Sequence, residues 1–455
     1  MKPLVVVQGP VATRSGYGNH TRDLVRSLIA MDKYDIQVIS LRWGDTPMDA
    51  LNSQDPKDIP IIQRIAKAGI NKKPDVFIQV SVPNEFALDP TNGKSMEQVL
   101  TGVYKIGVTA GIETTIAPHG FLEGCNRMDL ILATSEHAAD VLRKSSYDKV
   151  DNNTQQKVGE LRCETPIEVL FEGADLDTYF KTNEIDKNVV TELSQIKESF
   201  CYLFVGHWLK GAFGQDRKDI GMMIKTFCET FKNTSKGNKP ALVLKTSSAH
   251  FSICDRDIHW RRIQEIIASY GDKAPSIYLL HGDFSDDEMN SLYNHPKIKA
   301  MISFTKGEGY GRPLQEFALT GKPIIASGWS GQIDFLHKDY CNLLPGNLTN
   351  VHESAADQFI LKEAQWFTVD YAYASKVIKD SYKHYKKYLE RSRKMPQHIK
   401  TNFSMDKMTE RFSELLENKP ASSAPEQVAL KLPKLKKVGD NNNGIKLPKL
   451  KKVTS

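Results

Sequence analysis

Short apolar runs alternate with longer amphipathic stretches along the first part of the chain. Runs rich in β-branched and aliphatic residues predict buried strands over residues 4–7, 36–41, 76–80, 104–108 and 130–133. Between the first two runs, residues 20–31 place Leu24, Leu28 and Ile29 on one face and predict a helix. This alternation predicts a parallel sheet covered on both faces, with ligands at the carboxyl ends of its strands.

The same alternation resumes near residue 200. Strands are predicted over residues 202–205, 242–246, 276–280 and 298–304, and a charged stretch from about residue 371 predicts further helices. The expected fold class is α/β, with two Rossmann-like domains whose parallel sheets face each other across a cleft. The predicted divisions are residues 1–180 (first domain), 181–199 (linker), 200–370 (second domain), 371–418 (C-terminal helices) and 419–455 (tail).

The composition fits a soluble globular protein and excludes several classes. The 455 residues are 40% hydrophobic and 25% charged, and no apolar run reaches the ~18 residues of a membrane span. The apolar start of the chain stops at Gln8 and Gly9 without a cleavage site, so it is interpreted as a strand. Six cysteines without a C-x-x-C pair indicate reduced core residues of a cytoplasmic protein.

All of the net charge of +6 belongs to the tail. After residue 419, eight lysines stand against Glu426 and Asp440, so residues 1–419 sum to zero. The octapeptide K-L-P-K-L-K-K-V occupies residues 431–438 and recurs at 446–453. Its proline and its composition predict a disordered tail. The repeat is interpreted either as a docking motif for a partner protein present twice, or as an electrostatic tether to nucleic acid or to an anionic membrane surface.

The most informative stretch is the glycine-rich segment 304–316, between a predicted strand and a predicted helix. Backbone N–H groups and the helix dipole at such a turn suit an anionic ligand. Glu308 and Glu316 stand there with seven residues between them. A carboxylate beside a phosphate is useful when it accepts hydrogen bonds from hydroxyl groups. Phosphate and hydroxyls together describe a nucleotide sugar, whereas the alternative is a surface helix with a glycine-rich approach.

The spacing of the two glutamates, followed by G-K-P-I-I-A-S at residues 321–327, resembles the donor site of retaining GT-B glycosyltransferases, particularly glycosyltransferase family 4. The resemblance implies net retention, a UDP-sugar donor, and no metal or other cofactor. It implies that Glu316 holds the ribose and that Glu308 lies beside the donor sugar. It also implies that Arg217 and Lys218 reach the diphosphate, and that helices near the C-terminus return to the first domain.

The predicted catalytic residues are therefore Glu308, Arg217 and Lys218. The predicted donor-binding residues are Glu316, Gly307, Gly309, Tyr310, Gly311, Gly16, Gly18, Lys245 and Ser330. For the two early glycines, a tight turn with positive φ is the alternative. A D-x-D pair at Asp175 and Asp177 precedes the linker and is interpreted as a turn. No nucleophile is assigned.

Polar residues after two strands of the first domain are candidates for binding the acceptor. Glu113 and Thr114 follow the strand at 104–108, and Asn84 and Glu85 follow the strand at 76–80. The alternative is that they cap loops and helix starts. Many enzymes of the resembling family have a histidine in this region, and no histidine follows either strand here.

The sequence leaves the identity of the acceptor open. The basic tail motivates a hydroxymethylated base in DNA, as modified by phage enzymes, and the protein would then act in the host cytoplasm. The neutral body favours a glycan, lipid or protein acceptor. From other classes, a non-catalytic GT-B-like binding module and a sugar-nucleotide epimerase are alternatives. The presence of Glu308, Glu316 and Lys218 together favours a transferase.

Overall fold

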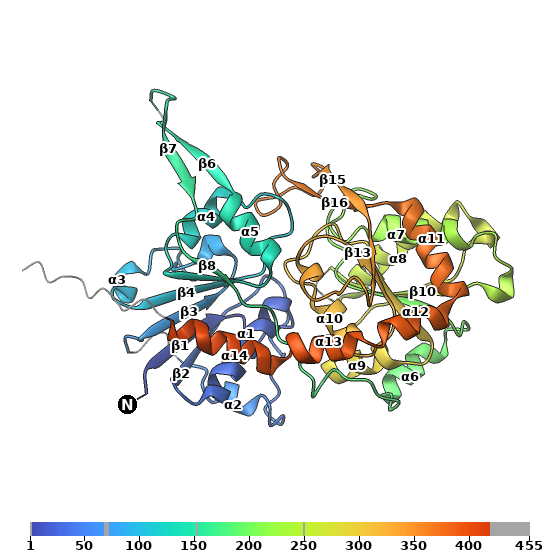
Figure 1. Cartoon of the computed structure of the whole chain (residues 1–455), viewed down its shortest axis with the longest axis horizontal. Helices are drawn as coiled ribbons and strands as arrows, with labels where there is room; N and C mark the ends of the chain where they lie inside the picture. The colour runs from blue at the N-terminus through green and yellow to red at the C-terminus, as the bar shows by residue number, and fades with distance from the viewer. Residues whose placement is uncertain (1, 68–71, 152, 249–250, 419–455) are drawn as a thin grey trace, which may run out of the picture. The chain divides into compact units, whose positions relative to one another are not determined.

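The computed structural model describes residues 2–67, 72–151, 153–248 and 251–418, which belong to one compact unit. The predicted disordered tail with its repeated octapeptide lies outside the described residues. Two parallel sheets form the framework of the compact unit (Figure 1). We call the part built on the first sheet, through β8, the first half, and the part from α6 to α13 the second half.

The first sheet has the strand order β2-β1-β3-β4-β5-β8, and its pairings are parallel. Its strands are β1 (Leu4–Gly9), β2 (Asp35–Ser40), β3 (Val76–Val80), β4 (Tyr104–Thr109), β5 (Leu130–Ala133) and β8 (Ile167–Val169). The helices of this half are α1 (Gly16–Met31), α2 (Ile59–Ile62), η1 (Pro83–Glu85), α3 (Glu97–Leu100), α4 (His119–Cys125) and α5 (Glu136–Lys144). Strands β1 and β3 are buried along their whole length, as a sheet covered on both faces requires.

The second sheet has the order β11-β10-β9-β12-β13-β14 and is also parallel. Its strands are β9 (Cys201–Val205), β10 (Ala241–Lys245), β11 (Ile277–Leu280), β12 (Ile298–Ser303), β13 (Ile324–Ser327) and β14 (Asn342–Leu344). Its helices are α6 (Lys187–Ser194), α7 (Ile220–Phe231), η2 (Lys236–Asn238), α8 (Ile253–Ala268), η3 (Gly271–Lys273), α9 (Asp286–Asn294), α10 (Arg312–Ala318) and η4 (Gly331–Asp334).

The last helices connect the two halves. They are α11 (Tyr371–Lys383), α12 (Tyr385–Ser392), α13 (Met395–Asn402) and α14 (Met405–Glu417). Figure 1 shows them crossing from the second half to the first. Met408 and Phe412 of α14 are buried in the apolar core of the first half, together with residues of α1 and β1. The chain thus ends its described part on the half where it began.

Most predicted strands are present within two residues of their expected bounds, because long aliphatic runs are buried on both faces. The first helix differs, since α1 begins at Gly16 instead of residue 20. Ser15 caps it by accepting a hydrogen bond from the N–H of Gly18. Neither Gly16 nor Gly18 takes a positive φ, so the tight-turn alternative for these glycines is wrong.

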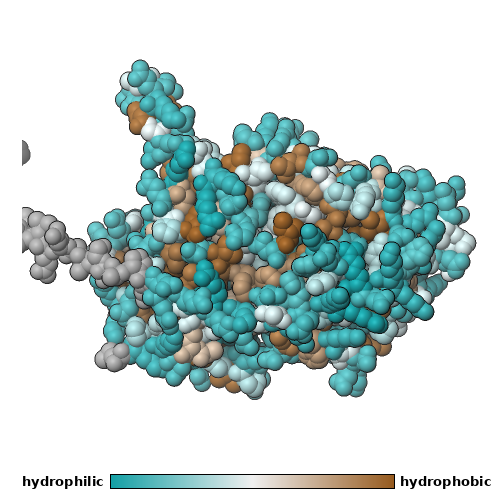
Figure 2. Space-filling model, in the orientation of Figure 1, coloured by the Kyte–Doolittle hydropathy of each residue, from teal (hydrophilic) through white to brown (hydrophobic). Residues whose placement is uncertain are grey.

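Some elements were not predicted from the sequence. Strands β6 (Ser146–Val150) and β7 (Lys157–Arg162) form an antiparallel hairpin that projects from the first half (Figure 1). Figure 2 shows a small apolar area on this hairpin, and Val158 is 67% exposed. Strands β15 (Gly346–Asn350) and β16 (Gln365–Val369) form a second hairpin. Such hairpins depend on cross-strand pairing more than on a buried apolar run, so periodicity does not reveal them.

The predicted linker and the predicted core cysteines agree with the structure only in part. Helix α6 lies inside the predicted linker and buries Val189 and Leu193 in the core of the second half, while the domain boundaries themselves stay a prediction.

All six cysteines are unpaired, and four of them are buried, but Cys254 is exposed. The helices of the described ranges include none that combines the length and the apolar character needed to cross a membrane.

Helix α4 provides a matched pair of glycines for a test of packing. A Cβ atom on Gly124 would lie 1.7 Å from the carbonyl oxygen of Pro83, whereas the nearest atom to a Cβ on Gly120 is 3.7 Å away. We expect Gly124→Ala to lower the free energy of unfolding by about 1–3 kcal/mol, because backbone must move. Gly120→Ala is expected to be neutral or stabilising by up to about 1 kcal/mol. Denaturant titration measures both, and equal effects would contradict the packing of α4 on η1.

Candidate active site

The glycine-rich segment joins β12 to α10 at the carboxyl edge of the second sheet. Gly311 caps α10 with a φ of 105°, which favours glycine. The N–H of Lys306 donates to the carbonyl of Arg217 at 2.7 Å, and the N–H of Glu308 donates to Ser330 Oγ at 2.9 Å. These bonds bring three predicted donor-site segments together, although they are far apart in the sequence.

The predicted catalytic residues form a buried charge cluster. Lys218 Nζ pairs with Glu308 Oε1, and Arg217 Nη1 lies 3.2 Å from Glu308 Oε2. Burial alone would raise the pKa of Glu308, but Lys218 and Arg217 together hold it below its ordinary value. Burial lowers the pKa of Lys218. The structure therefore places the three predicted residues in direct contact.

Glu113 joins this cluster from the first half. Its Oε1 lies 3.3 Å from Arg217 Nε, and burial raises its pKa. Among the predicted acceptor-binding residues, Glu113 pairs with a residue of the opposite half. We call Arg217, Lys218, Glu308 and Glu113 the cleft cluster. It contains two cations and two carboxylates at the line where the halves meet.

The glycines of the segment have a role that the sequence did not indicate. A Cβ atom on Gly307 would lie 1.9 Å from the carbonyl oxygen of Glu113, and one on Gly309 would lie 1.6 Å from that of Ala110. Ser135 Oγ donates to the carbonyl of Gly309 at 2.6 Å. These glycines therefore allow the backbone of the second half to touch that of the first.

Glu316 belongs to a second buried network. Tyr293 donates its hydroxyl to Glu316 Oε2 at 2.9 Å, and Arg312 Nε lies 3.3 Å from Glu316 Oε1. The same guanidinium lies 2.7 Å from Asp23 and 3.2 Å from Glu172. Burial raises the pKa of Glu316 to about 8 and that of Glu172 to about 7.

Arg312 is the central residue that sequence reasoning missed. It stands inside the motif, one helical turn before Glu316, so its position could have indicated a partner for that carboxylate. Its other partners, Asp23 on α1 and Glu172 after β8, come from the first half and carry no local signal. A further missed contact joins Arg14 and Asp283 across the halves at 3.0 Å.

Three other predicted donor-site residues, Tyr310, Gly18 and Lys245, lie against backbone carbonyl groups of the protein. Tyr310 is buried and donates its hydroxyl to the carbonyl of Glu172 at 2.9 Å. A Cβ atom on Gly18 would lie 2.2 Å from the carbonyl of Thr13, whereas Gly16 is exposed with open space beside it. Lys245 Nζ donates to the carbonyl of Gly282 at 2.7 Å, and burial lowers its pKa to about 8.

The remaining acceptor candidates form hydrogen bonds within the first half. Thr114 Oγ1 donates to the carbonyl of Ile116 at 3.1 Å, and Glu85 accepts a hydrogen bond from Ser81. The carbonyl of Asn84 accepts a hydrogen bond from Arg127 at 2.7 Å. These hydrogen bonds of Thr114, Glu85 and Asn84 thus lie within the first half, whereas Glu113 contacts Arg217 of the second half.

Asp175 and Asp177 lie in a turn, as the sequence indicated. Asp175 Oδ1 accepts hydrogen bonds from the N–H groups of Asp177 and Thr178 at 3.0 and 3.2 Å. Across the described ranges, no group of three or more His, Cys, Asp or Glu side chains is arranged to hold a metal ion. The chemistry that the site offers from its own residues is therefore that of cations and carboxylates. A buried Arg and Lys can neutralise a diphosphate, and buried carboxylates can accept hydrogen bonds from hydroxyls.

Comparisons with known proteins bear on the fold. No protein-family model matches the chain, and no curated protein sequence matches it. Among solved structures it is similar to HepE from Anabaena in complex with UDP and glucose (TM-score 0.56, 11% identity, covering 91% of this chain and 99% of that one). It is also similar to sucrose-phosphate synthase from Thermosynechococcus elongatus (0.59, 13%, 92% and 98%) and to a glycosyltransferase from Rickettsia africae (0.57, 13%, 91% and 98%).

These similarities extend over nearly the whole length of each neighbour. At sequence identities this low, they establish a shared fold and nothing more. The two parallel sheets, each with its helices, match the two Rossmann-like domains of those proteins. The predicted fold class is confirmed, and the chain has the GT-B fold.

Proposed function

We propose that this protein is a retaining, metal-independent glycosyltransferase that moves a sugar from a UDP-sugar to an acceptor hydroxyl. The observation that carries the proposal is the contact of Arg217 and Lys218 with Glu308 in the cleft cluster. The complexes of HepE with UDP and glucose, and with UDP-glucose, support the choice of donor. Retention rests on the resemblance to family 4 enzymes.

In the proposed reaction, the bond between the anomeric carbon and the diphosphate oxygen breaks, and the acceptor oxygen bonds to that carbon. The proton of the acceptor hydroxyl passes to the leaving diphosphate. Arg217 and Lys218 neutralise the charge that develops on the leaving diphosphate, which is the largest effect such a site can provide. Glu308 accepts a hydrogen bond from a sugar hydroxyl, and Glu316 accepts bonds from the ribose. Arg312 and Tyr293 hold Glu316 in place.

Metal independence is proposed because the Arg–Lys pair already supplies two positive charges at the diphosphate position. Glu113 and Glu308 balance the positive charge of that pair through their ion pairs with it. The raised pKa of Glu113 means that this carboxyl takes up a proton more readily than usual, which would offset the charge of an entering diphosphate.

Two kinds of acceptor are proposed on different observations. The repeated basic octapeptide of the tail favours recruitment to DNA and a hydroxymethylated base as acceptor, with docking of a partner protein as its alternative use. The neutral body of residues 1–419 favours a glycan, lipid or protein acceptor. The unpaired cysteines agree with a cytoplasmic location. An epimerase would instead isomerise the donor without any acceptor, and a binding module would leave it intact.

The basic pair provides the first functional test. We expect Lys218→Ala and Arg217→Ala each to reduce kcat by about 100-fold or more, because the leaving group loses its charge stabilisation. Lys210→Ala is the matched control, since Lys210 lies in the same loop and pairs with Asp357 at 3.1 Å. UDP release from UDP-glucose measures the effect. Wild-type turnover by the Lys218 variant would contradict the proposed role.

The pH dependence of UDP binding tests Glu316. Its pKa of about 8 means that the carboxyl is mainly neutral below this pH and charged above it. The charged form accepts ribose hydrogen bonds better, so UDP binding should strengthen as the pH rises toward the pKa, by up to about tenfold per pH unit. Lys245, with a pKa of about 8, loses its charge over the same range and acts in the opposite direction.

Calorimetric titrations of the wild type and of Glu316→Gln from about pH 6.5 to 9 separate these effects. Lys245 titrates in both proteins, whereas the amide that replaces the Glu316 carboxyl in the variant cannot ionise. The affinity ratio of wild type to variant is therefore expected to rise with pH. A constant ratio would mean that the charge of Glu316 does not contribute to UDP binding.

An acceptor screen decides between the two kinds of acceptor. Duplex DNA carrying hydroxymethylcytosine, with plain DNA as control, should gain the mass of one sugar, and Glu316→Ala should abolish the gain. Removal of residues 420–455 should leave turnover on a small acceptor unchanged and reduce activity on DNA at moderate salt. Transfer to glycans or proteins but not to DNA would contradict DNA as the acceptor and would still support the proposed transferase activity.

A further inference from the structure

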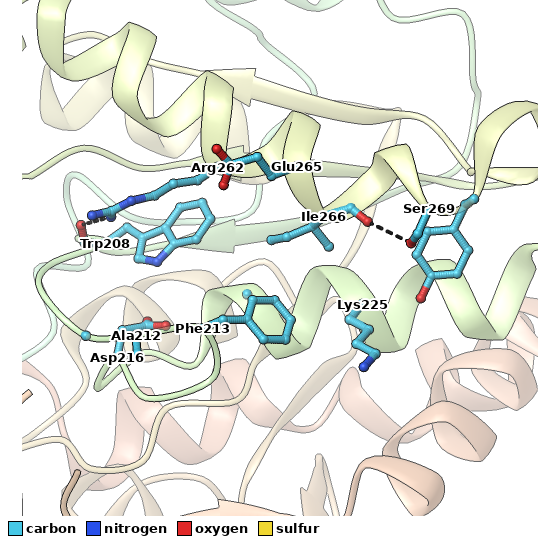
Figure 3. Close-up of a pocket in the computed structure, with 12 residues that line it drawn as sticks. Trp208, Ala212, Phe213, Asp216, Lys225, Arg262, Glu265, Ile266 and Ser269 are labelled. Atoms are coloured by element: carbon cyan, nitrogen blue, oxygen red, sulfur yellow. Dashed lines mark hydrogen bonds between the residues drawn. The ribbon is translucent and has the colours of Figure 1, made fainter. Parts of the chain in front are cut away.

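A cavity of about 420 Å³ lies between α7, α8 and the loop that joins β9 to α7. Trp208 and Phe213 line it from the loop, Lys225 from α7, and Arg262 from α8 (Figure 3). The lining includes no member of the cleft cluster. The cavity is therefore separate from the proposed donor site, although Asp216 in its wall directly precedes Arg217.

Two aromatic rings lie on opposite sides of the cavity. Figure 3 shows Trp208 with Ile266 on one side and Phe213 with Lys225 on the other. Trp208 is only 5% exposed, because its ring stacks on His259 with centroids 5.6 Å apart. Phe213 is 53% exposed, which is unusual for so apolar a side chain. The space between a fixed ring and an exposed ring suits a planar ligand.

The cavity also offers positive charge. Arg262 Nη1 donates to the carbonyl of Trp208 at 3.5 Å, and its guanidinium lies 5.4 Å from the Trp208 ring centroid. Lys225 Nζ lies 5.9 Å from the Phe213 ring centroid. Asp216 also lines the cavity, but its Oδ2 accepts a hydrogen bond from the N–H of Ile220 at 3.2 Å. Glu265 is exposed. Figure 3 shows the Arg262 and Lys225 head groups at opposite ends of the cavity, and Lys225 is the one beside the exposed Phe213 ring. An acidic group on a ligand that lies against Phe213 therefore pairs with Lys225.

Glycines shape this space. Gly221 faces Phe213, and a Cβ atom there would lie 3.1 Å from the ring. Gly211 and Gly214 have φ values of 142° and 72°, and a Cβ atom on Gly211 would lie 2.6 Å from the backbone of Asp216. The loop is thus folded tightly on itself around the cavity.

We propose that this cavity binds a small aromatic anion, a planar ring that carries a carboxylate, sulfonate or phosphate group. The ring lies between Trp208 and Phe213, and the acidic group pairs with Lys225. The ligand is an effector and not a substrate, because the cavity is separate from the cleft cluster.

The role as effector rests on the proposed function. The loop that lines the cavity continues into Arg217 and Lys218, and the carbonyl of Arg217 accepts a hydrogen bond from the N–H of Lys306 at 2.7 Å. A ligand that holds this loop acts on the two cations that would bind the donor diphosphate. By linkage, the effector and UDP change each other's affinity by the same factor.

The test uses the full-length protein with anilinonaphthalene sulfonate, a fluorescent aromatic anion, as the probe. We expect one saturable site, and about tenfold weaker binding in Lys225→Gln, which loses a charge-assisted contact. Arg261→Gln is the matched control, because it removes the same charge from an exposed neighbouring position on α8. Saturating UDP should change the probe affinity by about fivefold or more without displacing it.

A second variant keeps the test independent of surface charge. Gly221→Leu fills the space next to Phe213 and should abolish probe binding, while circular dichroism and the melting temperature verify that each variant is folded. Unchanged probe affinity in both Lys225→Gln and Gly221→Leu would overturn the site. Full displacement of the probe by UDP would also overturn it, since the probe would then occupy the donor cleft.

The failure of this inference differs from the failure of the proposed function. If the protein binds the probe as expected but neither binds UDP nor transfers sugar, the proposed transferase activity and the coupling to UDP are both wrong. The proposed binding site for the aromatic anion then still stands. A protein that transfers sugar and shows no probe site would keep the transferase. Probe binding that is unaffected by UDP would overturn the effector role alone.

Discussion

The cleft cluster is the interaction on which the rest of the arrangement depends. Two cations and two carboxylates leave water together, and a single one of them buried alone would cost several kcal/mol. Arg217 meets this cost by contacting a carboxylate from each half, Glu308 in the second and Glu113 in the first. The loop before α7, the glycine-rich segment and the loop after β4 are therefore positioned by one another.

Close backbone contact makes the cluster possible. Gly307 and Gly309 let the second half approach the carbonyl groups of Glu113 and Ala110, and any side chain there would push the halves apart. A second charged contact at Arg312 joins the same halves. Contacts between the domains of one chain are commonly polar, and such contacts allow the domains to move relative to one another.

The loop before α7 serves two surfaces. One side carries Arg217 and Lys218 into the cleft cluster, and the other forms the wall of the cavity beside Trp208. Asp219 anchors the end of this loop, since it lies 3.2 Å from Lys306 and accepts the hydroxyl of Tyr371 at 2.6 Å. Little backbone therefore lies between the two surfaces of this short, anchored loop.

The sequence by itself determined the two α/β halves, most strand positions and the association of Glu308 with Glu316 in one strand–turn–helix unit. These features depend on local periodicity and on turn residues, which report burial and chain direction directly. It also indicated the basic pair, through a resemblance. Only the tertiary structure decided that Glu113 contacts Arg217, that Arg312 contacts Asp23 and Glu172, and that the glycines serve backbone contact. Ion-pair partners depend on which loops meet at the sheet edges, and strand order and the packing of the two halves set those meetings between residues that are distant in the chain.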